Sequence, residues 1–295
     1  ILYLDSVLNA GGINSVSDML VVDSTTLSAG GATSVFIDNA GGLGAQTVGD
    51  GIKIIDVLTG PAGSVFGAFS LGNTRIASGA YEYRLYRSGL QMDDGDWYLR
   101  SSFRPAVASY SSVVPALAEY GNAMLGTLHE RVGESKTLNG LTSAAWIRWI
   151  NQGTDTTSST FEDARFDSRF SAVQAGLDIW QHQQENDSRW QAGFSFGYGH
   201  VNNRTQEAGV QSGTLRSNVI TYGIYGTWHG ANDSYIDVVV QKNRYDDISA
   251  LATDGDLLQT TGDGSVVSIE AGYPFAIGQY LKLEPQAQLV WQTLS

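Results

Sequence analysis

The sequence predicts a mainly β protein in which one helix separates two different β regions, and three observations support this fold class. Glycine accounts for 35 of 295 residues and aromatic residues for 11%, against only 5 prolines, a balance typical of many strands separated by glycine turns. Beyond residue 143, apolar and polar residues alternate over long stretches, as expected for strands. Only residues 113–134 repeat their apolar residues at helical spacing.

Charge and residue usage argue against several classes of function. The net charge is −13 and no segment is rich in Lys or Arg, so we expect no nucleic-acid partner. The chain has no cysteine, and its four histidines lie far apart without the spacing of a metal site. We therefore expect no metal and no cofactor. The first fifteen residues also lack the basic and apolar segments of a signal peptide.

Residues 1–102 read as short strands separated by glycine and Asp/Asn turns, recurring every 12 to 18 residues or so without helices between them. The expected strands are 19–23, 34–38, 51–58, 64–69, 81–87 and 96–100. Short strands at this spacing fit stacked rungs, as in a β-solenoid, and they fit an ordinary β-sandwich equally well.

The helical pattern in residues 113–134 predicts one continuous helix. Pro115 suits a first turn and Gly133 suits the end. Its apolar residues recur at spacings of three and four: Leu117, Met124, Leu125, Leu128 and Val132. Five polar residues interrupt this run: Glu119, Asn122, His129, Glu130 and Arg131. The segment is therefore too polar to span a membrane, which needs roughly 20 mostly apolar residues.

After residue 143 the expected strands become longer, roughly ten residues each. In residues 190–200, large apolar side chains alternate strictly with small or polar ones. Similar patterns run through 144–151, 166–180, 218–229, 235–244, 266–273 and 281–292. The polar segments between them alternate in length, with long ones at 153–167 and 202–217.

Strands with one apolar face and alternating loop lengths are typical of a transmembrane β-barrel, although a soluble sandwich remains the alternative. In a barrel, the polar face lines the lumen. Its small residues would leave space there: Gly193, Ser195, Gly197, Gly199 and Gly223. We expect the preceding helix to occupy that space, since about 18 residues at 1.5 Å each would thread most of an apolar band about 25 Å tall.

Several segments, in this order, resemble the translocator of type V autotransporters, a family that includes pertactin-like adhesins and self-cleaving serine protease autotransporters. They are residues 120–134, 144–149, 233–240 and 281–291. Upstream, residues 49–57, 78–87 and 94–101 resemble the autochaperone end of the family's right-handed β-helical passenger. The resemblance covers nearly the whole chain.

The resemblance implies a non-enzymatic secretion unit in the bacterial outer membrane, with its passenger region at the cell surface. Its partners would be outer-membrane lipid, the barrel-assembly (BAM) machinery and periplasmic chaperones during biogenesis, and its own passenger. The expected domains are a passenger end (1–104), a linker with the lumen helix (105–134), and the first part of the barrel (135–295).

The family's barrel has about twelve strands, whereas only about seven are expected here. An antiparallel sheet of seven strands does not close as an ordinary even-numbered bacterial barrel. Two explanations fit: the sequence is part of a longer protein, or it is an assembly intermediate with open edges.

Some family members cleave their own linker by asparagine cyclisation, assisted by acidic residues in the lumen. By resemblance, the residues for this step would be Asn122, Asp237, Glu270 and Glu284, although Gly121 stands where the protease members carry the cyclising asparagine. The alternative role of the three acids is only to line the lumen and hydrogen-bond the helix.

Arg148 is expected on the lumen face of the first barrel strand, beside Trp146. It could hold the helix by pairing with Glu119 or Glu130, or it could be a solvated lumen residue. The sequence has no nucleophile elbow and no ordered triad, so we expect no enzyme apart from single-turnover self-cleavage. A soluble adhesive or binding protein is the competing function.

Overall fold

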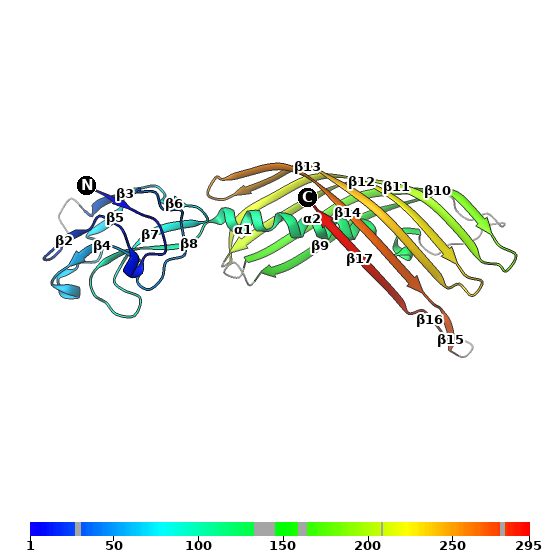
Figure 1. The fold of residues 1–295 in the computed structure, drawn as a ribbon, viewed down its shortest axis with the longest axis horizontal. Coiled ribbons are helices and arrows are strands. Elements are labelled where there is room, and N and C mark those ends of the chain that lie inside the picture. The colour runs from blue at the N-terminus through cyan, green and yellow to red at the C-terminus, as the bar shows by residue number, and fades with distance from the viewer. Residues whose placement is uncertain (27–30, 133–144, 159–163, 208, 278–280) are drawn as a thin grey trace. The chain divides into compact units, whose positions relative to one another are not determined.

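The computed structural model of the chain describes residues 1–26, 31–132, 145–158, 164–207, 209–277 and 281–295. Two compact units make up the fold, Ile1–Val107 and Ala108–Ser295. Figure 1 shows short strands in the first unit, and long strands around a helix in the second. The mainly β fold class is therefore confirmed.

The first unit is built on parallel ladders of short strands. β1 (Leu2–Ser6), β3 (Thr33–Asn39) and β5 (Phe69–Leu71) form one parallel sheet, in which Leu2 pairs with Val35 and Thr33 with Phe69. β2 (Leu20–Val22) lies parallel to β4 (Ile52–Val57) in a second sheet. Parallel pairing between segments far apart in sequence is typical of stacked β-helical rungs, since a sandwich is built from antiparallel hairpins.

An antiparallel hairpin extends the second sheet of this unit. β8 (Trp97–Phe103) pairs with β4, and β7 (Tyr81–Arg87) and β6 (Ala77–Ser78) follow in order. Two short 3₁₀ turns, Gly12–Asn14 and Gly60–Gly63, connect strands. The apolar interior contains fully buried side chains from both sheets, including Val35 of the first sheet and Ile54 and Leu99 of the second.

Two details of this unit differ from the sequence prediction. The expected strand 64–69 is mostly a turn, because Gly67 adopts a positive φ of 80° and pairing resumes only at β5. β1 and β6 were not predicted. β6 is only two residues long, too short to show a period.

Three helices follow in the chain: α1 (Pro105–Ser111), α2 (Val113–Leu125) and α3 (Leu128–Val132). The prediction of one continuous helix over 113–134 is therefore wrong. The helix is continuous at Asn122 but ends at Gly126, whose φ and ψ are 60° and 175°. The expected terminator, Gly133, lies outside the described residues. No helix in the described part of the chain combines the length and apolar character needed to cross a membrane.

The second unit contains one antiparallel sheet of seven strands, in the order β17-β14-β13-β12-β11-β10-β9. Its strands are β9 (Ala145–Ser158), β10 (Ala164–Gln183), β11 (Arg189–Glu207), β12 (Val210–His229), β13 (Tyr235–Ala252), β14 (Leu257–Gly272) and β17 (Gln286–Leu294). Figure 1 shows this sheet curling around α2. The predicted number of barrel strands is confirmed.

The strands are longer than predicted, because much of the sequence expected in polar loops is paired. Asn202 and Arg216 both lie in the expected loop 202–217, yet they pair with each other, and Asn202 also pairs with Arg169 of the predicted strand 166–180. Backbone hydrogen bonding continues past the apolar band here, since polar side chains do not prevent a hairpin from pairing. A small part of the expected 153–167 loop, 159–163, lies outside the described residues.

The predicted strand 281–292 is divided in two. β16 (Leu281–Leu283) pairs with β15 (Phe275–Ile277), and β17 begins only after Pro285. Proline has no N–H to donate to a ladder, so it marks the point where the pairing changes.

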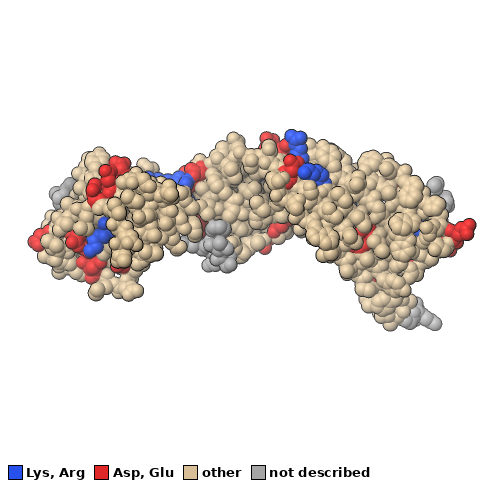
Figure 2. Space-filling view, viewed as in Figure 1, with Lys and Arg blue, Asp and Glu red and all other residues tan. Residues whose placement is uncertain are grey.

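The sheet has apolar side chains on its outer face and small or polar ones on the inner face, which faces α2. On β11, Phe194, Phe196 and Tyr198 are 46 to 50% exposed, whereas the residues between them are buried. Figure 2 shows that the visible surface of this unit is largely uncharged, with a small mixed group of charges at its upper edge. The soluble sandwich is therefore wrong: the apolar face of this sheet is its outside, and no second sheet among the described residues packs against it.

Candidate functional site

The candidate site is the contact between the helices and the inner face of the sheet. Small residues allow the close approach. A Cβ added at Gly197 would lie 2.5 Å from Met124 Cε, and one at Gly199 would lie 2.6 Å from the Tyr120 hydroxyl. On the helix, a Cβ at Gly121 would lie 2.5 Å from Gln292 Nε2. At Gly199 an added Cβ would also lie 2.6 Å from Ala172 Cβ and 2.8 Å from Ser171 O, so glycine is needed there. At Gly197 and Gly121 the nearest atoms are the ends of flexible side chains, which an added Cβ would displace.

The N-terminal part of α2 packs into an apolar collar on the inner face. We define the collar as Phe170, Val201, Leu215, Val219, Tyr245, Ile248 and Ala250, all buried. Tyr120, fully buried, packs edge-on against Phe170 and Tyr245, with ring centroids 6.2 and 6.4 Å apart. The sequence predicted a polar inner face, and this part of it is apolar because it contacts the apolar side of α2.

Five inner-face side chains donate hydrogen bonds to main-chain carbonyls of the helix and its end. The donor and acceptor pairs are Tyr245 Oη to Leu117 O (2.9 Å), Gln292 Nε2 to Ala118 O (3.2 Å), Gln241 Nε2 to Gly121 O (3.1 Å), Arg148 Nη2 to Met124 O (2.6 Å) and Gln288 Nε2 to Gly126 O (3.1 Å). The donors come from β9, β13 and β17. The sheet thus contacts the linker backbone along much of its length.

The acidic residues of the inner face contact α3. Asp237 accepts a hydrogen bond from Arg131 at 2.6 Å and another from Thr227 at 2.6 Å, and the side chains of Arg131 and Asp237 are each only 3% exposed. Glu270 accepts from the Leu128 backbone N–H at 2.9 Å and from the Tyr235 hydroxyl at 2.6 Å. Both carboxylates are therefore engaged in binding the linker.

Glu284 lies between β16 and β17, outside the strands of the seven-stranded sheet. Its Oε1 is 2.8 Å from His129 Nε2, which links α3 to the end of the sheet. The hydrogen bond from His129 lowers the pKa of Glu284 below its usual range, and a hydrogen bond from Gln286 acts in the same direction.

The structure does not bring the three acids to Asn122, the residue expected to cyclise. Asn122 is exposed, in the interior of α2, and the acids contact residues 128, 129 and 131 instead. Cyclisation needs assisting groups held beside the reacting amide. The arrangement of these four residues therefore gives self-cleavage no support, and it remains an untested hypothesis.

Arg148 contacts the helix, but by a route different from the expected one. It donates to the Met124 carbonyl and, through Nε, to Gln174 Oε1 at 2.7 Å. Glu119 accepts instead from Thr156 Oγ1 at 3.1 Å, and Glu130 accepts from the Thr127 N–H at 2.9 Å. The expected ion pair is wrong because Arg148 lies beside the end of α2, where unpaired carbonyls are available.

The remaining predicted small residues of the inner face are all buried: Gly193 and Ser195 on β11, and Gly223 on β12. Ser195 is 6% exposed, and its hydroxyl would lie 2.5 Å from a Cβ at Gly223. Gly193 makes room for Tyr225, whose ring atom Cζ would lie 2.5 Å from an added Cβ.

Sequence reasoning missed most of the donors, namely Gln241, Tyr245, Gln288 and Gln292. A signal was present: the alternation of 286–292 placed three glutamines on the polar face of that strand. Their targets are main-chain carbonyls, however, which leave no trace in the helix sequence.

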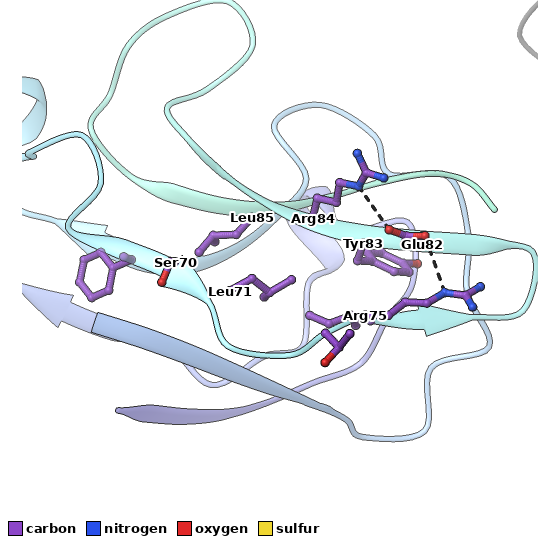
Figure 3. A pocket seen from close by; sticks show the side chains of 10 residues that line it. Ser70, Leu71, Arg75, Glu82, Tyr83, Arg84 and Leu85 are labelled. Carbon is purple, nitrogen blue, oxygen red and sulfur yellow. Dashed lines mark hydrogen bonds and ion pairs between the residues drawn. The ribbon is translucent and has the colours of Figure 1, made fainter. Parts of the chain in front are cut away.

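Other places in the described structure offer no comparable site. The described residues contain no cluster of His, Asp or Glu suited to a metal ion. A pocket of about 410 Å³ lies between β5 and β7 in the first unit, and Figure 3 shows the side chains that line it. Its charged groups already pair with each other, since Glu82 contacts both Arg75 (3.7 Å) and Arg84 (3.3 Å). We therefore assign it no ligand.

Comparison with known proteins gives two family matches. Residues 145–295 match the autotransporter beta-domain, and residues 1–85 match the autochaperone domain type 1. The chain is 32% identical to the adhesin BmaC autotransporter of Brucella suis over 96% of its own length, and 27% identical to the probable autotransporter YfaL of Escherichia coli over 99%. It spans only 9% and 25% of these relatives.

Among solved structures, the transport unit of the autotransporter AIDA-I from Escherichia coli is similar in fold. The match has a TM-score of 0.50 at 17% sequence identity, and it covers 65% of this chain and 63% of that one.

Proposed function

Because this chain belongs to the autotransporter family, we propose that its linker stays uncleaved inside the β-domain, where it tethers the passenger and closes the pore. The family places the chain as a translocator unit of the bacterial outer membrane, with the passenger region at the cell surface. That the linker tethers the passenger and that it closes the pore are two separate parts of the proposal, and different contacts support each of them.

The observation that carries the proposal is the set of five hydrogen bonds from the inner face to main-chain carbonyls of the linker. Each such bond contributes about 0.5–1.5 kcal/mol net, and the charged Arg148 contributes more. Together with the buried Arg131–Asp237 pair, they would hold the helix in the pore without any covalent attachment to the sheet.

The linker also carries the features of an uncleaved segment. The acids that would assist cyclisation bind the backbone or side chains of α3, and Asp237 is already paired with a cation. A carboxylate in a buried ion pair is a poor proton acceptor, because removing its charge would leave Arg131 unpaired. This arrangement favours a structural role for the acids.

The apolar collar supports closure of the pore. Tyr120 and Met124 are both 0% exposed, so this level of the inner face leaves no continuous wet path beside α2 on the seven strands described. Water and ions cross a dry apolar constriction poorly, because polar groups and ions pay a large cost to leave water.

We further infer that the BAM machinery and periplasmic chaperones act on the chain before insertion. The outer face of the seven-stranded sheet exposes large apolar side chains, among them Trp149, Phe194 and Ile224. A continuous apolar face of this kind tends to aggregate in water until lipid or a protein partner covers it. Outer-membrane lipid is then the partner of the exposed aromatic face.

The tether is tested by N-terminal sequencing of the β-domain in the outer-membrane fraction of cells that express the full-length protein. We expect passenger and β-domain to remain in one polypeptide, with Asn122→Ala giving the same result. An abundant fragment that starts at Ala123, and disappears in Asn122→Ala, would overturn the proposal.

Closure is tested on the same protein by single-channel conductance in planar bilayers. The intact protein should be nearly closed, and Tyr120→Ala should open it, because this change empties the centre of the collar. A large steady conductance in the unmodified protein would contradict closure without affecting the tether.

A further inference from the structure

We propose that Gly126 and Arg148 together form a register lock, which sets the axial position at which the linker stops in the pore. The inference rests on the proposed function, since it assumes that the linker stays there. It adds a specificity rule: the sheet accepts a linker whose helix breaks at a glycine opposite Arg148, and disfavours one that continues as a helix.

The first part of the lock is steric. Gly126 has φ 60° and ψ 175°, a region that essentially only glycine occupies. A Cβ at this position would also overlap the guanidinium nitrogen Nη1 of Arg148. The backbone conformation therefore favours glycine at this site, and any other residue would also have to displace the guanidinium of Arg148.

The second part of the lock is hydrogen bonding at both ends of the break. On the α2 side, Arg148 and Gln288 donate to Met124 O and Gly126 O. On the α3 side, Glu270 accepts from the Leu128 N–H. Helix ends leave carbonyls and N–H groups unpaired, and here side chains of the sheet pair with them.

Residues of the linker itself also favour a helix end at this point. The Thr127 N–H donates to Glu130 Oε2 at 2.9 Å, and the Glu130 N–H donates to Thr127 Oγ1 at 3.2 Å, which is a capping box. α3 therefore starts at this point by its local sequence, and the sheet supplies hydrogen-bond partners for both sides of the break.

A displaced linker would lose all of these contacts together. Each residue of helical shift moves the chain by about 1.5 Å, which takes the Met124 carbonyl away from Arg148. The preceding glycine of the linker, Gly121, is five residues earlier and lies within α2 against Gln292. A shift of about 7.5 Å would be needed to bring it opposite Arg148.

The test measures linker position by cross-linking in outer membranes containing the full-length protein. The chain described has no cysteine, so introduced pairs report cleanly. Glu119→Cys is combined with Thr156→Cys, since these two side chains are in contact at 3.1 Å. It is combined separately with Gln152→Cys, four residues along the same face of β9 and roughly 13 Å away.

A short bifunctional thiol reagent should join 119 to 156 in strong preference to 119 to 152. In Arg148→Ala, the ratio of the two products should fall at least tenfold, because losing a charge-assisted hydrogen bond costs more than the roughly 1.4 kcal/mol that corresponds to a tenfold change. Gly126→Ala should lower the ratio at least as much, because the added Cβ strains the backbone at this position and displaces the Arg148 guanidinium.

Arg148→Lys provides a second measurement if either variant inserts poorly. It retains the charge but lacks the planar guanidinium, and it should give an intermediate ratio. The matched controls are Arg169→Ala, whose side chain is 72% exposed, and Gly153→Ala, where a Cβ would have its nearest neighbour at 3.8 Å. Both controls should keep the original ratio.

An unchanged ratio in Arg148→Ala and Arg148→Lys would overturn the register lock and leave the proposed function intact, since the linker would still be in the pore. Absence of both cross-links in the otherwise unmodified protein would overturn the proposed function and the lock together. The two failures are therefore distinguishable.

Discussion

In both units of this protein, side chains alternate between two faces of each strand. The first unit buries the apolar face, whereas the second unit exposes it. In the first unit, apolar side chains such as Ile54 and Leu99 point inward and are 0% exposed. In the second, Ile224 and Phe194 point outward and are 63% and 46% exposed, while the inner face is polar or packed against α2. The comparison teaches that alternation fixes which residues share a face, whereas the surrounding medium decides which face is outside.

The largest expected effect comes from placing the same charge on the apolar face of each unit. Ile54→Arg buries an unpaired cation and should destabilise the first unit by about 4 kcal/mol or more. Ile224→Arg should cost the barrel about 2–4 kcal/mol in lipid.

Limited proteolysis of the full chain during urea titration reports the two units separately. The comparison fails if Ile224→Arg has no effect in lipid vesicles, because an outer face in contact with lipid must resist a charge.

The next effect concerns the buried ion pair that joins linker and sheet. Arg131→Ala leaves Asp237 buried without its cation and should destabilise the barrel by about 3 kcal/mol. Arg169→Ala removes a partner of Asp167 on the outer face, where the pair is exposed, and should cost less than about 1 kcal/mol.

The measurement is the urea midpoint of the heat-modifiable folded form. Equal midpoints in Arg131→Ala and Arg169→Ala would show that the linker contributes nothing to barrel stability.

A smaller effect should distinguish the first unit by its response to alkaline pH. Burial lowers the pKa of Lys53, but its hydrogen bonds and charge interactions with Asp96 and Asp56 outweigh this, and the net pKa is raised above 10.5. Asp96 also accepts from the Val57 N–H at 2.8 Å, so the pair joins β4 to the start of β8.

The stabilisation by Lys53 should be full below pH 10.5 and should disappear as the pH rises through the raised pKa of the folded state. The check is the difference in urea midpoint between the parent and Lys53→Met, measured from about pH 9 to 12. A difference that grows with pH would contradict the assignment.

The smallest effect is expected at Glu284, whose pKa is lowered chiefly by His129. Its stabilising contribution should be full above pH 4.5 and lost as the pH falls through the lower pKa of the folded state. Glu284→Gln should remove this dependence and leave the Lys53 response unchanged. The same urea assay, carried down to acid pH, measures it, and a parent protein that gains stability on acidification relative to the variant would disprove the contribution.

Much of the sheet was predictable, because period-two alternation is local information. Residues 190–200 were assigned to the correct faces, and the number of barrel strands was correct. The ends of the strands were not predicted, because β10, β11 and β12 continue into polar sequence that has partners across the hairpin. Pairing of that kind depends on a neighbouring strand, and the pattern within one strand does not reveal it.

The candidate site was only partly predictable. Arg148, Asp237 and Glu270 were correctly assigned to the inner face, but their partners were not. The break at Gly126 was missed because the apolar spacing of 113–132 continues across it. The local signals of the break are Gly126 and the Thr127–Glu130 capping box, and Arg148 and Glu270 add hydrogen bonds on either side of it.

The sequence by itself determined the class of this protein. Alternation in a strand places its side chains on two different faces, and the polar helix is a suitable occupant for the space that small residues leave on the inner face. The tertiary structure decided which groups of the sheet hold the linker. Those contacts join main-chain carbonyls to side chains from distant strands. A backbone carbonyl is the same in every residue, so only the folded arrangement could show which ones are bound.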